Sequence, residues 1–164
     1  SDTTLTRSAA GVLAVEGKIV PTWDGVVRKS ADESVTSSTA LQDDNHLTFT
    51  GVSGTAYLIE IDLLYEGTGA GDIKIDLGED SINRGVMSCA GYDATNTAAI
   101  RAMAMNQTDT LSFGAFAGRN TGITMRGIYT SGGAAFKVRW AQNASSGTST
   151  VVSAGSVLRY RAIS

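Results

Sequence analysis

The side chains that could act as a nucleophile or a general base are few in this sequence. It contains a single histidine, His46, and a single cysteine, Cys89. A Ser-His-Asp triad or a Cys–His pair would have to use His46 as its base. No G-x-S-x-G motif presents a serine, and Cys89 lies in an apolar segment, where a free cysteine behaves as a small hydrophobic residue. We therefore predict that His46 is a loop residue beside a strand and that neither residue is catalytic.

The polar triplet Asp43-Asp44-Asn45 offers the oxygen ligands that calcium prefers. The glycine and the distal glutamate of an EF-hand loop are missing from its spacing. A polar turn before the strand that begins near Leu47 explains the triplet at least as well, and we favour that interpretation. One cysteine and one histidine cannot fill a zinc site. The sequence thus predicts no metal and no cofactor.

Glu60 and Asp62 have a spacing that would suit glycoside hydrolysis. They lie on one face of a predicted strand, about 7 Å apart, which is within the range of inverting glycosidases. The same spacing is expected of the solvent side of an amphipathic strand. We favour the second interpretation and predict that the protein is not an enzyme.

Charge and composition argue against other classes of function. The formal net charge is -3 and the pI is about 5.0, and no stretch carries a run of Lys or Arg. This pattern predicts no nucleic-acid partner. No apolar run approaches the length of a membrane-spanning helix, so we expect no membrane partner. The glycine-rich segment 67–72 lacks the Lys-Ser/Thr of a phosphate-binding loop and is typical of a hairpin turn.

The elements that would position these side chains are predicted to be strands. The chain has 19 glycines, one proline and only 18% charged residues, a composition typical of short strands joined by Gly/Ser turns. Segment 57–65 alternates most clearly, with its aromatic and aliphatic residues on one face and Glu60 and Asp62 on the other. Segment 94–106 resembles a helix in composition, but its alternation favours a strand.

About eight to ten such strands at regular spacing are typical of an antiparallel sandwich or barrel. We predict an all-β protein, an antiparallel β-sandwich with jelly-roll connectivity. Residues 28–164 are assigned to the sandwich and residues 1–27 to an N-terminal arm. Gly11 and Gly17 indicate tight turns within the arm, which would include a small hairpin. Such a piece buries too little to be stable alone, so it either docks on another copy or a partner, or is a frayed terminus.

Two stretches carry a resemblance to a known group of proteins. Residues 28–49 contain the phrase Lys-Ser-Ala-Asp-Glu-Ser-Val, followed by Leu-Gln-Asp-Asp, and lead into the strand at 56–65. Together they resemble a module of tailed-bacteriophage virion proteins found in minor tail, tail-fibre and head-associated proteins. The resemblance extends loosely over residues 26–164. Residues 5–13 are similar to a short phrase that accompanies phage fibre domains. The resemblance implies a compact β-sandwich that assembles as a trimer, and it supplies no catalytic residues.

A trimer needs a buried seam between its subunits. Met103 and Phe116 are candidates because each lies opposite the other apolar residues of its strand. A core filled from both sheets would explain them equally well. The expected subunit or capsid contacts are Leu5, Val12, Leu13, Val15, Trp23, Met103 and Phe116.

Two functions follow from the resemblance. The first is a trimeric capsid decoration protein, bound to the major capsid protein on the outside of the head and stabilising its capsomers. The second is a tail-fibre or minor tail protein that recognises the host surface. In both, the expected location is the virion surface, after assembly in the bacterial cytoplasm. The partners would be further copies of this chain and a capsid or tail protein.

Overall fold

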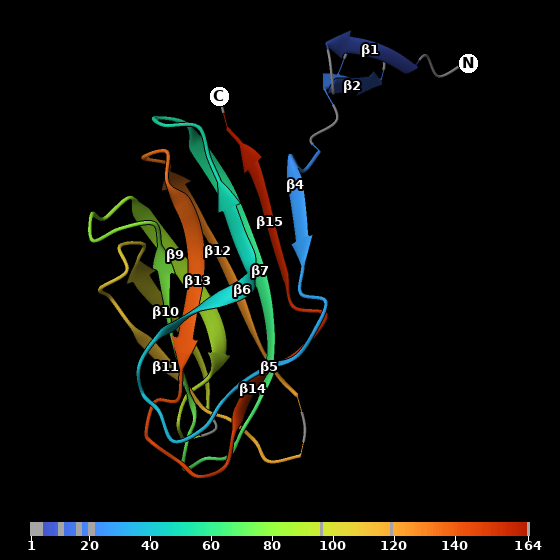
Figure 1. Ribbon diagram of the computed structural model, residues 1–164. Helices are drawn as coiled ribbons and strands as arrows, with labels where there is room; N and C mark the ends of the chain where they lie inside the picture. The colour runs from blue at the N-terminus through green and yellow to red at the C-terminus, as the bar shows by residue number, and fades with distance from the viewer. Residues whose placement is uncertain are drawn as a thin grey trace.

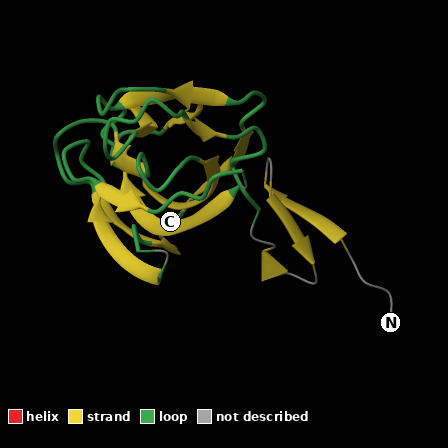
Figure 2. Ribbon diagram, turned by 90° about the horizontal axis from the view of Figure 1, so that it is seen from below, coloured by secondary structure: helices red, strands yellow, loops and turns green. Residues whose placement is uncertain are grey.

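The computed structural model describes residues 22–95, 97–118 and 120–163, together with the backbone of three short strands before residue 22. All regular elements in this part of the chain are strands, joined by loops and turns (Figure 2). None of the described segments is a helix long and apolar enough to cross a membrane. The prediction of an all-β protein is confirmed.

The strands form two antiparallel sheets that pack face to face (Figures 1 and 2). The larger sheet contains β4 (Gly25–Arg28), β5 (Glu33–Val35), β7 (Ala56–Glu66), β9 (Gly85–Tyr92), β10 (Ala98–Ala104), β12 (Thr121–Thr130), β14 (Thr150–Val152) and β15 (Val157–Ala162). The smaller sheet contains β6 (Gln42–Thr50), β8 (Ile73–Gly78), β11 (Leu111–Phe113) and β13 (Ala135–Ala141). This arrangement is the predicted antiparallel β-sandwich.

The chain passes repeatedly from one sheet to the other. The larger sheet runs in the order β10-β9-β12-β7, and β7 then pairs with β14 at one end and with β15 along the rest of its length. β15 pairs in turn with β4. The smaller sheet has the order β11-β8-β13-β6. The predicted jelly-roll connectivity stays a prediction, and the β9–β10 hairpin forms one edge of the larger sheet.

The core lies between the two sheets and follows the predicted alternation. On β7, Ile59, Ile61 and Leu63 are fully buried, whereas Glu60 and Asp62 face outward. The smaller sheet contributes buried side chains that include Ile75. Because both inner faces are apolar, the two sheets exclude water from each other, which is the main source of stability for such a sandwich.

The predicted boundary at residue 28 falls inside a strand of the sandwich. β4 starts at Gly25 and pairs with β15, so Val26 and Val27 belong to the larger sheet and not to the arm. Before it, β1 (Leu5–Ala9), β2 (Val12–Val15) and β3 (Lys18–Ile19) form a separate three-stranded antiparallel sheet. Among the described strands, no ladder joins this small sheet to the sandwich.

Candidate interaction surface and buried ion cluster

The larger sheet presents one side to solvent, which we call the outer face. It is formed by the outward residues of β10, β9, β12, β7, β15 and β4. One row across it, set by the strand registers, contains Ala102, Ser88, Arg126, Glu60, Arg159 and Val26. The next row contains Ile100, Ala90, Thr124 and Asp62. At the β9–β10 end, these rows carry the small side chains of Ala102, Ser88 and Ala90.

Several large apolar side chains remain exposed on the outer face. Ile100 is 81% exposed and lies beside Ala90. Val86 and Ile128 are 56% and 52% exposed and are direct neighbours across the β9–β12 ladder. Val26 on β4 is 58% exposed. Val86 and Ile128 thus form one exposed apolar pair, with Ile100 further along the β9–β10 ladder, and exposed apolar side chains of this kind are typical of a surface that contacts another protein.

The charged residues of the outer face are paired across strands. Arg126 Nε lies 3.3 Å from Glu60 Oε1, and Arg159 Nη1 lies 2.7 Å from Asp62 Oδ2. Glu60 and Asp62 therefore sit on the solvent side of an amphipathic strand, as predicted, and each carboxylate has an arginine partner. Basic and acidic groups alternate along the row formed by Arg126, Glu60 and Arg159.

A shallow hollow of about 190 Å³ lies at the β4 end of the outer face. Trp23, Leu58, Glu60, Arg126 and Arg161 line it, together with Thr22. The guanidinium of Arg161 lies 6.0 Å from the centre of the Trp23 ring, within cation–π range. The hollow thus combines an aromatic ring with charged groups.

The structure places the predicted contact residues in different environments. Trp23 is half-buried beside the hollow. Phe116 is half-buried too, and its ring makes an edge contact with Tyr92 at 5.6 Å. Met103 is only 1% exposed and belongs to the core, so its expected contact role is wrong. The reason is that β10 turns Met103 inward and Ile100 outward. The side chains of Leu5, Val12, Leu13 and Val15 lie outside the described residues.

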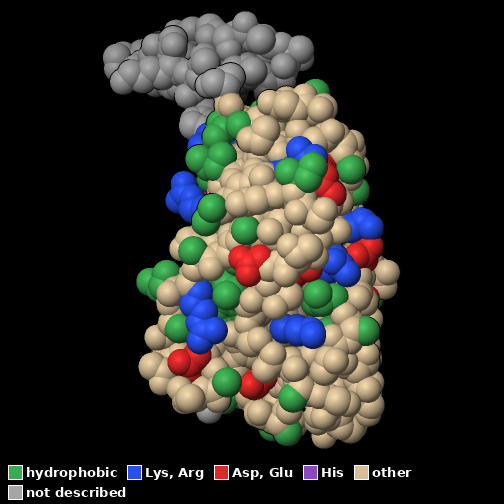
Figure 3. Space-filling view, turned by 90° about the vertical axis from the view of Figure 1, so that its left-hand side faces the viewer, with side chains coloured by type: hydrophobic (Ala, Val, Ile, Leu, Met, Phe, Trp, Pro, Cys, Tyr) green, Lys and Arg blue, Asp and Glu red, His purple; other side chains and the backbone are tan. Residues whose placement is uncertain are grey.

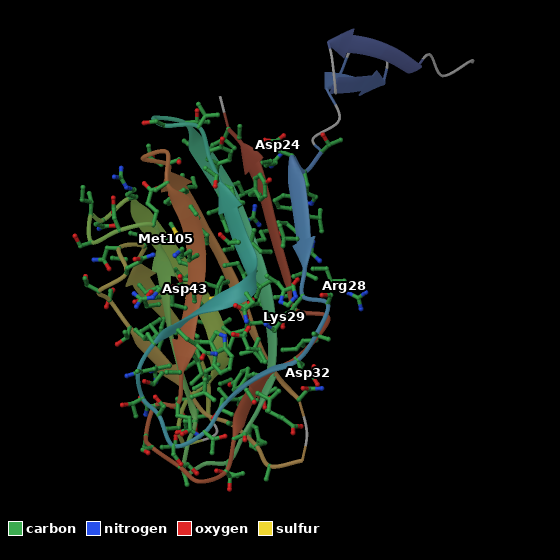
Figure 4. All side chains as sticks on the ribbon, in the orientation of Figure 1. Asp24, Arg28, Lys29, Asp32, Asp43 and Met105 are labelled. Atoms are coloured by element: carbon green, nitrogen blue, oxygen red, sulfur yellow. The ribbon has the colours of Figure 1, made fainter. Side chains whose placement is uncertain are left out.

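A buried ion cluster lies where the chain leaves β4. Lys29 is fully buried, and its Nζ lies 2.7 Å from both Glu33 Oε2 and Asp44 Oδ2. Trp140 Nε1 donates a hydrogen bond to the same Asp44 oxygen at 3.3 Å. Figure 4 shows Lys29 next to β6, whereas its neighbour Arg28 points away from the molecule. The cluster links the larger sheet to β6 and β13 of the smaller one.

The same cluster accounts for the polar triplet. Ligand atoms of Glu33, Asp44 and His46 lie within 4.8 Å of one another. The Lys29 ammonium, however, occupies the position between the two carboxylates that a cation would take. Asp43 points to the surface, where it pairs with Lys137 and Arg139. We therefore assign the two carboxylates of the triplet, Asp43 and Asp44, to side-chain ion pairs rather than to calcium.

His46 and Cys89 lie on different strands and sheets. His46 Nε2 is 3.0 Å from Ser30 Oγ, and its Nδ1 is buried without a hydrogen-bond partner. His46 belongs to β6 itself rather than to a loop beside a strand, so that detail of the prediction is wrong. Cys89 is fully buried in β9, where burial raises the pKa of its thiol to about 12. A thiol of this kind stays protonated at neutral pH and is a poor nucleophile.

Sequence reasoning missed Lys29 and Ile100. A buried lysine is rare and is normally paired, and the nearby acids Glu33 and Asp44 are the only signal the sequence holds for it. For Ile100, the alternation in segment 94–106 predicts a strand but does not indicate which face is exposed. Figure 3 shows the side of the molecule at the left of Figure 1, where basic and acidic groups are interspersed. This mixture agrees with the absence of basic runs in the sequence.

Comparison with known proteins adds little. No protein-family model matches the chain, and no curated protein is significantly similar to it. Solved structures of infectious bursal disease virus are weakly similar. The match to the structure of the Gt strain of this virus has 13% sequence identity and a TM-score of 0.22. It covers 92% of this chain and 45% of the viral chain. The match to the T13 particle of the virus has 10% sequence identity and a TM-score of 0.25. It covers 92% of this chain and 42% of the viral chain. This chain thus spans less than half the length of those proteins, and TM-scores this low do not indicate a shared fold.

Proposed function

We propose that this chain is a non-enzymatic structural component of a tailed-bacteriophage particle, and specifically a trimeric decoration protein on the outside of the head. The outer face is the observation that carries the proposal. It leaves Ile100, Val86 and Ile128 exposed beside paired charges of both signs. The resemblance of residues 28–49 to a phage virion module supplies the kind of particle.

The outer face has the composition of a protein–protein interface. Its apolar residues lie over β9, β10 and β12, and its ion pairs lie over β12, β7 and β15. The exposed apolar residues therefore lie toward one edge of the sheet and the ion pairs near its middle, and subunit contacts commonly bury apolar and paired polar groups together. Three copies arranged around a symmetry axis would each bury part of this face. A trimer would then bind a capsid through three weak contacts at once, which raises its overall affinity.

The described residues also fit a role without catalysis. The carboxylates of Glu60 and Asp62 are neutralised by arginines. The Cys89 thiol lies in the core, and the Lys29 amine is buried between two acids. These groups support the fold and its surface, which is what a particle component requires.

The hollow beside Trp23 favours a second candidate function. An aromatic ring next to Glu60, Arg126 and Arg161 is the kind of site that stacks a sugar ring and hydrogen-bonds its hydroxyls. A tail-fibre or minor tail protein that recognises a cell-surface glycan would use such a site.

The copy number in purified particles distinguishes the two proposals. A quantitative gel of intact virions should show this protein at an abundance comparable to that of the major capsid protein. Heads that lack it should lose resistance to heat or low salt. An abundance comparable to that of tail proteins would favour the second function. Unchanged survival of heads that lack the protein would contradict the decoration role.

A further inference from the structure

The buried amine of Lys29 is in direct contact with a carboxyl group on the opposite sheet. Nζ lies 2.7 Å from Asp44 Oδ2, and the side chains of both residues are completely buried. An ion pair that is removed from water pays a large desolvation cost. Buried amine and carboxyl groups held in contact also have a high effective concentration toward each other. This contact therefore has the proximity that amide formation requires.

The Asp44 carboxyl group is held in a geometry suited to nucleophilic attack. Its Oδ1 accepts hydrogen bonds from the backbone N–H groups of His46 and Leu47, both at 2.9 Å. When an amine attacks the carboxyl carbon, negative charge develops on this oxygen. Two preorganised N–H donors stabilise such charge in the manner of an oxyanion hole. The other oxygen, Oδ2, faces Lys29 and the indole N–H of Trp140.

Glu33 is placed to move protons in the same reaction. Its Oε2 lies 2.7 Å from Lys29 Nζ. The carboxylate is fixed by the Asn45 backbone N–H at 3.2 Å and by Gln42 Nε2 at 3.1 Å. Its side chain is only 15% exposed. A carboxylate in hydrogen-bond contact with a reacting amine can take its proton and return it to a leaving oxygen.

We propose that Lys29 and Asp44 condense in the folded chain to form an isopeptide bond, with Glu33 as the proton carrier. The bond between Nζ and Cγ of Asp44 forms, and the bond between Cγ and Oδ2 breaks. Two of the three ammonium protons leave with Oδ2 as one water molecule, and Glu33 transfers protons from Nζ to Oδ2. The opposite charges of Lys29 and Asp44 disappear together. The step requires no oxidant, reductant or other reactant.

The product would be a covalent link between the two sheets. Lys29 directly follows β4 of the larger sheet, and Asp44 lies on β6 of the smaller one. The single cysteine of the chain cannot form an internal disulfide. An isopeptide bond would give the sandwich the same kind of cross-link, in any redox environment. This inference concerns the chain itself and does not depend on its role in a particle.

The intact mass of the full chain, measured under denaturing conditions, tests the proposal. The wild-type protein should be lighter than its sequence by the mass of one water molecule. Trypsin should fail to cut after Lys29, so the peptide spanning residues 29–74 should appear with the same mass deficit. Lys29→Arg keeps the positive charge but should have the full sequence mass. Asp43→Asn changes the adjacent, surface carboxylate and should keep the deficit.

Each alternative result has a clear meaning. A wild-type protein of full sequence mass would overturn the proposal and leave an ion pair only. A water deficit that persists in Lys29→Arg, or cleavage after Lys29 in the light species, would also overturn it, because the water would then be lost elsewhere. Glu33→Gln should form the link slowly or not at all. A link formed at the wild-type rate in this variant would remove Glu33 from the reaction.

Discussion

Phe49 and Tyr160 stack face to face across the two sheets, with ring centroids 3.9 Å apart and an interplanar angle of 11°. Phe49 lies on β6 and Tyr160 on β15, the last strand of the chain. Tyr57 makes edge contacts with both rings. This aromatic cluster joins the end of the chain to the smaller sheet and closes one end of the sandwich.

Removing the Phe49 ring should destabilise the fold strongly. Phe49→Ala should lower the free energy of unfolding by about 3–5 kcal/mol, because it leaves a cavity among buried aromatic residues. Urea unfolding followed by fluorescence measures this loss. Val52→Ala is the matched control, since Val52 is 69% exposed. A loss at Phe49 no larger than that of the control would contradict the assigned role of the cluster.

Cys89 should be inert in the folded protein. Its pKa is raised by burial to about 12, so alkylation at neutral pH should be slow in buffer and fast in denaturant. The raised pKa also means that the folded state holds this proton more tightly than the unfolded chain. Stability should therefore fall as the pH rises above 9.0, the ordinary thiol value, toward 12. Rapid labelling of the native protein would show that Cys89 is accessible.

Asp76 and Asp80 should respond to pH in opposite directions. Burial raises the pKa of Asp76 above its ordinary 3.8 despite the nearby Arg139, and one of its oxygens has no hydrogen-bond partner. Above this value, the buried negative charge of Asp76 therefore lowers the stability of the folded state. Below it, the carboxyl group is protonated in both states and this destabilisation disappears. Asp76→Asn should be more stable than wild type at pH 7, and the gain should vanish in acid.

The hydrogen bond from Arg84 lowers the pKa of Asp80. Its charge therefore favours the fold at neutral pH, and this contribution is lost as the pH falls through the lowered value. Asp80→Asn should be less stable than wild type at pH 7, and the difference should close in acid. Thermal unfolding of both variants across this pH range measures the two trends. Parallel trends would contradict the assigned environments.

The sequence predicts the fold better than the contacts. On β7, large apolar residues alternate with Glu60 and Asp62, so the pattern alone indicates the inward face. On β10 one face carries Ile100 among alanines and the other carries Met103 together with Arg101, so alternation alone does not reveal that Met103 is buried and Ile100 exposed. The face of β10 that is buried is determined by its pairing with β9 and by tertiary packing.

The contacts of the buried ion cluster could not be predicted from the sequence for a related reason. Glu33 lies four positions and Asp44 fifteen positions after Lys29 in the sequence. Both acids contact the ammonium only because β6 crosses into the smaller sheet beside the end of β4. A lysine followed by acids is usually a solvated segment, and nothing local distinguishes this one.

The mass of the protein in solution tests the central claim most directly. Light scattering coupled to size exclusion should give three times the 17.0 kDa of one chain. Ile100→Lys should reduce this to one chain without loss of strand content, because it places a charge on the outer face. Ile82→Lys, at a residue that is 58% exposed in a loop, should leave the trimer intact. A wild-type protein with the mass of one chain at all concentrations, or a trimer unaffected by Ile100→Lys, would contradict the account.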